Sequence, residues 1–141
     1  MVDDLLVGAW QSIVFGVVGI ALMAAGFMLV DALTPGRLRE LIWLRRNSNA
    51  TLLLVANQLG IAGIVFTAIL TSYTDFAKGL ASTVLFGLIG LGIMALAFLV
   101  LDWLTPGKLG EVLSADEPHP AARVSAATHF GAALFVCACI A

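Results

Sequence analysis

Four long runs of apolar residues divide the chain, and polar residues gather in the short segments between them. Each run has about twenty residues or more, the length at which a helix crosses the hydrocarbon core of a bilayer. The runs show no alternation of apolar and polar positions, which excludes a transmembrane barrel. The pattern predicts an all-α polytopic membrane protein, a single membrane domain over residues 1–141 with spans at Trp10–Leu33, Ala50–Tyr73, Leu80–Leu104 and Ala121–Ala141.

The first and third runs carry the same sequence pattern. Residues 15–38 and 86–109 align at an offset of 71, and twelve of the 24 aligned positions are identical. Self-similarity at a fixed spacing indicates two copies of one structural unit. We predict two tandem helical hairpins of the same orientation, an internal repeat over residues 10–73 and 80–141. A pseudo-twofold axis along the membrane normal would relate them.

Composition narrows the range of functions. Charged residues make up 11% of the chain, against about a quarter in ordinary soluble domains. The net charge of −2 gives no electrostatic reason to expect nucleic acid as a partner. Cys137 and Cys139 point away from each other on a helix, and the chain lacks nucleotide-binding loops, zinc-ligand spacings and nucleophile motifs. We therefore expect no enzyme activity, no cofactor and no bound metal.

The basic residues predict an orientation in the membrane. Six of the seven Lys and Arg residues follow the first and third spans, and only Lys78 lies between the second and third. The positive-inside rule then places residues 34–49 and 105–120 in the cytoplasm and both termini outside a bacterial plasma membrane. The acidic start, Met1–Asp4, does not suit a signal peptide. A basic surface for lipid or protein partners is expected from Arg37, Arg39, Arg45 and Arg46.

Each long loop begins with the motif Asp-x-Leu-Thr-Pro-Gly. Proline disfavours helical geometry in the residue before it, so each span should break at the threonine. Threonine is also a good N-cap, and proline suits the first position of a helix. We therefore predict short interfacial helices that start at these breaks, after spans one and three. The motif residues are Thr34, Pro35 and Gly36 in the first copy, and Thr105, Pro106 and Gly107 in the second.

Two carboxylates, Asp31 and Asp102, lie three residues before these breaks. A carboxylate at the hydrocarbon edge is tolerated where it reaches water or a positive group. Each Asp then anchors the end of its span or binds the following turn. Alternatively, the two form a paired acidic site at the cytoplasmic mouth of the bundle. The sequence leaves both readings open.

A few polar residues lie inside the spans. Asn57 and Gln58 align with Thr128 and His129 in the second half, about 12 Å beyond the cytoplasmic start of each span. Polar side chains at that depth face other helices or a wet cavity. They would form interhelical hydrogen bonds of about 0.6 to 2 kcal/mol each, or they would line a polar path or a small pocket.

Small residues repeat as regularly as the aspartate motif. Ser12, Gly16 and Gly19 match Thr83, Gly87 and Gly90, and Ala56 and Gly60 match Ala127 and Gly131. Small residues on one helix face allow backbones to approach closely in a membrane. The pattern predicts tight packing within the bundle, between copies of the chain, or both.

The doubled motif resembles the YjfL-like family of small bacterial inner-membrane proteins, a domain of unknown function. The resemblance is carried by Asp31, Thr34-Pro35-Gly36 and Asn49-Ala50 in the first half and by Asp102 and Thr105-Pro106-Gly107 in the second. The second half departs from it, with Pro120-Ala121 where the first has Asn49-Ala50. The resemblance implies four helices in the plasma membrane and an accessory role, without an established chemistry.

These observations favour a non-enzymatic integral membrane protein that assembles with itself or with partners at its cytoplasmic face, with envelope maintenance as one such role. The alternative is a small passive channel or transporter, with a polar path at Gln58 and His129 and the Asp pair at its mouth. Every carboxylate lies at a span end or in a loop, which weighs against proton-coupled export because coupling needs a titratable group deep in the membrane.

Overall fold

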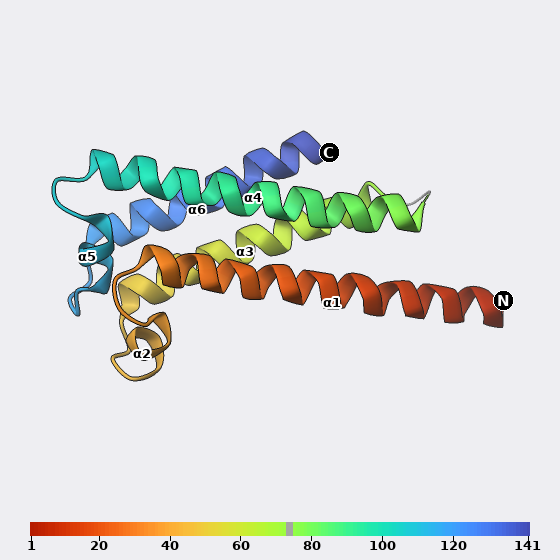
Figure 1. Cartoon of the computed structure of the whole chain (residues 1–141), viewed down its shortest axis with the longest axis horizontal. Coiled ribbons are helices and arrows are strands. Elements are labelled where there is room, and N and C mark those ends of the chain that lie inside the picture. Colours follow the sequence, from red (N-terminus) through yellow and green to blue (C-terminus); the bar gives the residue numbers. More distant parts are fainter. Residues whose placement is uncertain (73–74) are drawn as a thin grey trace.

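The computed structural model describes residues 1–72 and 75–141, and all regular structure in them is helical. There are four long helices, α1 (Val2–Leu33), α3 (Ser48–Leu70), α4 (Phe76–Leu104) and α6 (Pro120–Ile140) (Figure 1). A short helix joins each pair of long ones within a half: α2 (Leu38–Trp43) lies between α1 and α3, and α5 (Leu109–Ser114) lies between α4 and α6. Each long helix is long and apolar enough to cross a membrane. The prediction of an all-α protein with four spans is confirmed.

The helix ends differ in detail from the predicted spans. The first helix begins at Val2 rather than Trp10, because Asp3 and Asp4 suit the first turn, where carboxylates interact favourably with the helix dipole. Helix α4, the third span, begins at Phe76 rather than Leu80, since the Asp75 side chain accepts from the N–H groups of Ala77 and Lys78. Helix α3, the second span, ends at Leu70. Tyr73, where we predicted that this span ends, lies outside the described residues.

The first and third spans both end at the threonine of the Asp-x-Leu-Thr-Pro-Gly motif, as predicted. Helix α1 ends at Leu33 and α4 at Leu104, and Thr34 and Thr105 have extended backbones. The predicted capping role of these threonines is wrong, because the short helices start only at Leu38 and Leu109.

Pro35 and Pro106 lie in the turns between the helices and not at a first helical position. The glycine after each proline explains the delay. Gly36 and Gly107 have φ of +95° and +96°, a left-handed conformation that turns the chain away from the span before a new helix can start.

The third helix lies at the centre of the bundle. It packs against α1, α4 and α6, and the pair α3–α6 forms the most extensive interface. Gly60 allows this close approach, because a Cβ at that position would lie 2.7 Å from the Cβ of Ala133. Two buried apolar clusters fill the bundle, one around Leu53 and Phe98 near the short helices and one around Ile61 and Met94 nearer the termini.

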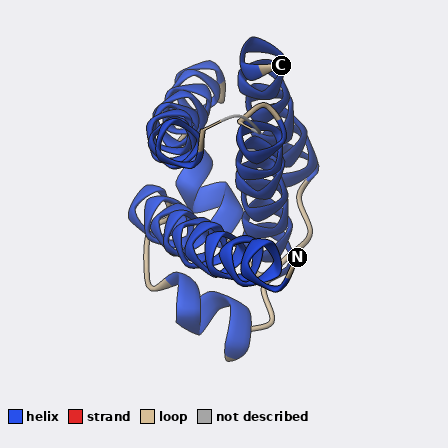
Figure 2. Ribbon diagram, turned by 90° about the vertical axis from the view of Figure 1, so that its right-hand side faces the viewer, coloured by secondary structure: helices blue, strands red, loops and turns tan. Residues whose placement is uncertain are grey.

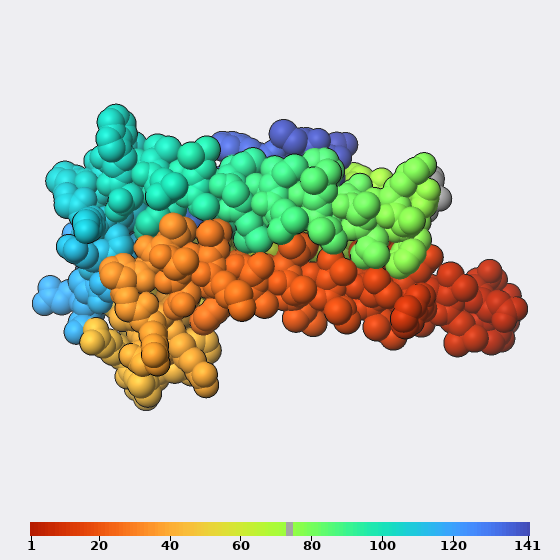
Figure 3. Space-filling view, in the orientation of Figure 1, coloured from red at the N-terminus to blue at the C-terminus, as the bar shows by residue number. Residues whose placement is uncertain are grey.

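The two halves have the same succession of elements, but a pseudo-twofold axis does not relate them. Such an axis would pair an α3–α4 interface with an equal α1–α6 interface. Among the described residues α3 packs against α4, whereas α1 and α6 form no comparable interface. Instead α1 lies along α4 (Figure 3), and α3 lies beside α6. Figure 2 shows the bundle end-on, along its long helices. The second hairpin thus stacks on the first, as units do in a solenoid.

Candidate functional site

The two aspartates of the repeated motif make the same contact in each half. One carboxylate oxygen of Asp31 accepts from the N–H of Leu38 at 2.7 Å, and one of Asp102 accepts from the N–H of Leu109 at 2.7 Å. Leu38 and Leu109 are the first residues of α2 and α5, whose N–H groups have no partner within their own helix. Each aspartate therefore supplies the cap that we predicted from a threonine. We call the segments 31–38 and 102–109 the two elbows.

Each aspartate binds within its own elbow. Asp102 lines a surface pocket of about 340 Å³ together with Leu33 and Pro35 of the first elbow. Asp31 does not line this pocket, and its carboxylate binds its own turn. The first elbow packs against α5 through Gly110, where a Cβ would lie 2.7 Å from Cδ of Pro35. The geometry agrees with the anchoring role of the aspartates.

Two asparagines hold the loop that leads into α6. The Asn49 side chain donates to the carbonyls of Ala115 (3.1 Å) and Glu117 (2.8 Å) and accepts from the N–H of His119 (2.9 Å). Asn47 caps α3 by accepting from the N–H of Ala50 and also donates to the Ala115 carbonyl (2.8 Å). We call this set of bonds the loop clamp. The alignment of the two halves shows only that Pro120 occupies the position of Asn49 in the second half.

Four arginines lie at the surface around α2. Arg37, Arg39, Arg45 and Arg46 are all exposed, and Arg37 lies 3.7 Å from Glu40. The leucines Leu38 and Leu41 of α2 are buried against the protein core. The apolar side chains that α2 and its end leave exposed are therefore Trp43 and Leu44, next to the arginines as expected of a segment in the headgroup region.

The polar residues of the spans face the interior of the bundle. Asn57, Ser125 and His129 are fully buried, and Gln58 is partly buried. A Cβ on Gly26 of α1 would lie 2.8 Å from Nδ2 of Asn57, and the Phe98 ring meets the His129 ring edge to face with centroids 6.0 Å apart. This polar core therefore has contributions from α3 and α6 and is covered by α1 and α4.

The polar core does not contain the interhelical hydrogen bonds that we considered. Within the described chain, six buried polar atoms of these side chains have no hydrogen-bond partner: Nδ2 and Oδ1 of Asn57, Oε1 of Gln58, Oγ of Ser125, and Nδ1 and Nε2 of His129. In residues 1–72 and 75–141, no group of three His, Cys, Asp or Glu side chains is placed to hold a metal ion.

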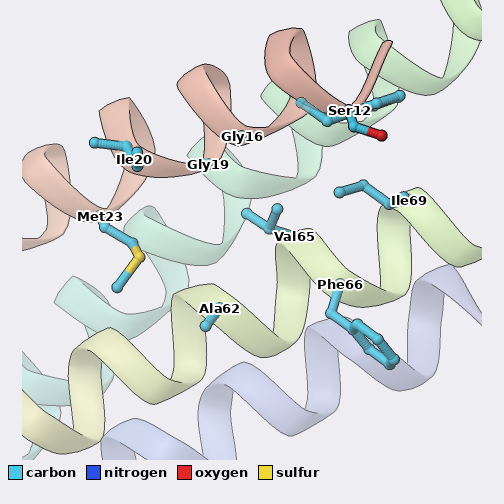
Figure 4. A pocket seen from close by; sticks show the side chains of 10 residues that line it. Ser12, Gly16, Gly19, Ile20, Met23, Ala62, Val65, Phe66 and Ile69 are labelled. Carbon is cyan, nitrogen blue, oxygen red and sulfur yellow. The ribbon is translucent and has the colours of Figure 1, made fainter. Parts of the chain in front are cut away.

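The small-residue faces of α1 and α4 have different surroundings. On α4, Thr83, Gly87 and Gly90 are buried, and a Cβ on Gly87 would lie 2.5 Å from Cδ1 of Leu22. On α1, a Cβ on Gly16 would meet nothing within 4 Å. Here α1 and α3 border an apolar groove of about 480 Å³ (Figure 4). We call this the α1–α3 groove; its lining includes Ser12, Gly16, Gly19, Met23, Ala62, Val65 and Phe66.

The surroundings of Gly60 on α3 and of its repeat counterpart Gly131 on α6 also differ. A Cβ on Gly60 would meet Ala133 and Met94, whereas one on Gly131 would meet nothing within 4 Å. Close packing against another helix of the chain is thus found at Gly60, Gly87 and Gly90. It is absent within the chain for Gly16 and Gly131, and Gly19 makes only an ordinary contact with Val65 at 3.4 Å.

A family model described as a Domain of Unknown Function (DUF350) matches residues 4–140. The chain belongs to the DUF350 family. Its relatives include a UPF0719 transmembrane protein of Mycolicibacterium paratuberculosis, 34% identical over 118 residues, which are 84% of this chain and 78% of the relative. UPF0719 transmembrane proteins of Mycobacterium bovis and Mycobacterium tuberculosis are each 31% identical over 122 residues, 86% of this chain and 80% of the relative. No solved structure matches.

Membership of DUF350 agrees with the resemblance found in the sequence at the level of a membrane family of unknown function. This DUF350 chain is an integral membrane protein, since its relatives are transmembrane proteins and its four long helices are apolar. The structure brings the first elbow against α5, and it brings Asn47 and Asn49 against the loop before α6. It buries Asn57 of α3 and His129 of α6 inside the bundle. Asp102 lines the pocket beside the first elbow, and Asp31 binds its own turn.

Proposed function

We propose that this DUF350 protein is a non-enzymatic membrane component that assembles with further copies of itself. The observation that carries the proposal is the open α1–α3 groove. The same small-residue face is buried on α4 and uncovered on α1. A helix face that is shaped for close packing and has no helix against it within the chain has the form of an association surface in a membrane.

The YjfL-like resemblance supports an accessory role of this kind. In lipid, apolar side chains alone give helices little reason to associate, because lipid tails are as apolar as leucine. Close backbone approach at glycine gains dispersion contacts that lipid chains do not match. An assembled layer of such bundles in the plasma membrane, with the basic surface around α2 as a contact for anionic lipid or a protein partner, is consistent with envelope maintenance.

Size measurement in a lipid environment tests the proposal. The native protein in nanodiscs or mild detergent should be larger than one chain by light scattering. Gly16→Leu should reduce the assembled fraction, because the new side chain occupies the groove. Gly92→Leu is the matched control, since a Cβ at Gly92 also meets nothing within 4 Å and Gly92 does not line the groove. A native protein that is monomeric at all accessible concentrations would overturn the proposal.

We also propose that both elbows face the cytoplasm and both termini face outward. The positive-inside bias supports this orientation. Helices α2 and α5 lie at one end of the bundle, and both termini lie away from that end (Figure 1). Reporter fusions at Arg46 and at Ala141 give a direct test. A cytoplasmic signal from the fusion at Ala141 would contradict the orientation.

A second candidate function, a passive polar path, is favoured by the polar core. Buried polar atoms without partners are costly in an apolar medium, and ordered water commonly satisfies them. Under this proposal, Asn57, Gln58 and His129 line a hydrated path through the bundle, and the aspartates act as elbow anchors. Because no carboxylate lies deep in a span, a pH gradient should not drive solute uptake.

Flux into liposomes distinguishes this candidate from assembly alone. A path through the polar core predicts a leak of water or small ions that Asn57→Leu abolishes. Thr128→Leu serves as the control, because Thr128 is the repeat counterpart of Asn57 and is not among the buried residues of α6. A leak that is equal in both variants would reject the polar core as its route. Proton-driven uptake that His129→Gln abolishes would replace both proposals with a transporter.

A further inference from the structure

We infer that copies of this chain associate head to tail, with α6 of one copy seated in the α1–α3 groove of the next. The inference rests on the proposed function and names the partner surface for the groove. It follows from the way in which the first half of the chain already holds the second half. The same contacts, shifted by one repeat, are available between copies.

The internal interface supplies the template. Gly60 on α3 receives Ala133 of α6 and Met94 of α4. Gly90 on α4 receives Ile64 of α3, and Gly87 receives Leu22 of α1. In each pair one partner belongs to the first half and the other to the second. The first half therefore uses one surface to bind the second half, and its opposite surface has no third hairpin to bind.

The repeat offset of 71 residues identifies the unused surfaces. Moving the first template contact by one repeat places Gly131 against Ala62 and Met23 of another copy. Ala62 and Met23 line the α1–α3 groove, and their residue types are the same as those of Ala133 and Met94. Within the chain a Cβ on Gly131 would meet nothing within 4 Å. The chain thus carries both sides of this contact without joining them.

The other template contacts shift in the same way. Gly19 in the groove of one copy would receive Phe135 of another copy, as Gly90 receives Ile64 within the chain. Gly16 in the groove of one copy would receive Ile93 of another copy, as Gly87 receives Leu22 within the chain. Phe135 is 72% exposed, so a large apolar side chain stands uncovered on α6 where the template requires one. A phenyl ring is wider than the isoleucine that it replaces, and the open groove has room for it.

The cytoplasmic end of the template is not reproduced. The loop clamp depends on Asn49, and its counterpart is Pro120, which cannot donate or accept through its side chain. Gly110, which packs closely against Pro35, has the bulky counterpart Arg39. The contact between copies should therefore be confined to the membrane-spanning part and be weaker than the internal one.

The geometry of the halves makes this contact compatible with one membrane. Helices α2 and α5 lie at the same end of the bundle (Figure 1), so a shift by one repeat keeps every copy in the same orientation. The two surfaces are different, and a contact between different surfaces forms rings where the rotation closes and open rows where it does not.

Cysteine cross-linking in native membranes tests the inference on the full chain. In a background of Cys137→Ala and Cys139→Ala, the pair Ala62→Cys and Gly131→Cys should give a ladder of covalent multimers on oxidation. In their template pair, a Cβ at Gly60 would lie 2.7 Å from the Cβ of Ala133, so the two backbones approach closely enough for cysteines at the shifted positions to meet. The control pair, Ala62→Cys with Leu99→Cys, should give no ladder. Leu99 and its counterpart Met28 are 54% and 70% exposed, as expected of a lipid-facing position in both halves.

Single variants determine the direction of the contact. Coexpressed chains that carry Ala62→Cys and Gly131→Cys separately should form mixed dimers, and neither variant alone should cross-link. A dimer from Gly131→Cys alone would show a face-to-face contact and overturn the inference. Independently of oxidation, Gly131→Leu should weaken association about tenfold through overpacking, whereas Gly92→Leu should leave it unchanged.

The outcomes separate this inference from the proposed function. Multimers that persist by light scattering without a ladder from the Ala62→Cys and Gly131→Cys pair would place the contact elsewhere, and the inference would be wrong while assembly stands. A monomeric native protein would overturn both. Circular dichroism and thermal unfolding of each variant confirm that the chain is folded before its association is scored.

Discussion

Helices α1 and α4 carry the same small-residue pattern, and only α4 uses it inside the chain. Gly87 and Gly90 of α4 receive side chains from α1 and α3, whereas Gly16 of α1 faces an open groove. The difference arises from position in the stack and not from residue type. The comparison teaches that a repeated packing motif defines what a helix face can bind, while the order of the repeats decides whether the chain supplies the partner.

The same contrast holds for the glycines of α3 and α6. Gly60 lies between the two halves, and Gly131 lies on the free side of the second half. In stacked repeats, inner surfaces are covered by neighbours and terminal ones are not. Substitutions at equivalent positions should therefore have unequal effects, and the following predictions are ordered from the largest expected effect to the smallest.

The largest effect should come from Gly60→Leu. The new side chain would collide with Ala133, so the free energy of unfolding should fall by about 3 kcal/mol, the upper part of the range for overpacked cores. Gly131→Leu should not lower it, because a Cβ at Gly131 would meet nothing within 4 Å and leucine favours a helix more than glycine does. Denaturant titration of monomeric protein in detergent, followed by circular dichroism, measures both. Equal losses in the two variants would break the comparison.

The next effect should come from the loop clamp. Asn49→Ala removes three hydrogen bonds, so we expect a loss of about 2 kcal/mol, somewhat less than the sum at about 1 kcal/mol per bond because water can reach the loop. Amide hydrogen exchange should accelerate in residues 115–119. Ser48→Ala, at an exposed neighbouring position, is the control and should leave both measurements unchanged.

The elbows should respond alike in the two halves. Asp31→Ala and Asp102→Ala each remove one side-chain acceptor at a helix N-terminus, a loss of about 1 kcal/mol. Asn at either position keeps an acceptor oxygen and should cost less than Ala. Thermal unfolding in one detergent compares the four variants. A loss at Asp102 that is several times larger than that at Asp31 would give one aspartate a role beyond its elbow.

The smallest effect should distinguish the motif threonines. The Thr34 hydroxyl is buried without a partner, and the Thr105 hydroxyl donates to the Leu101 carbonyl at 2.7 Å. Thr34→Val should therefore be neutral or stabilising by a few tenths of a kcal/mol, and Thr105→Val should destabilise by about 0.5 kcal/mol. Melting temperatures measured side by side are sufficient, and a reversed order would contradict the assignment of these bonds.

The sequence predicted the features that depend on local pattern. Apolar length gave the four spans, and the Thr-Pro dipeptides gave both breaks, because hydrocarbon thickness and proline sterics act within a few residues. The caps were assigned wrongly because the acceptor is an aspartate seven residues before the capped N–H. That reach depends on the left-handed glycine between them.

Features that join distant parts of the chain could not be predicted. The loop clamp connects residues 66 to 70 positions apart, and nothing in the local pattern around Asn49 names its partners. The sequence placed Asn57 and His129 at similar depths, but it could not show that their polar atoms would be buried without hydrogen bonds. It also could not show which copy of the small-residue face the bundle covers, because the two copies have nearly the same residues.

The loop clamp has a consequence for biosynthesis. Asn47 and Asn49 belong to the first hairpin, which leaves the ribosome and enters the membrane first, as N-terminal segments do. The carbonyls of Ala115 and Glu117 and the N–H of His119 acquire their side-chain partners only when that hairpin is already in place. The last connection of the chain is thus completed on a surface made by its earliest part, and the order of contacts follows the order of translation.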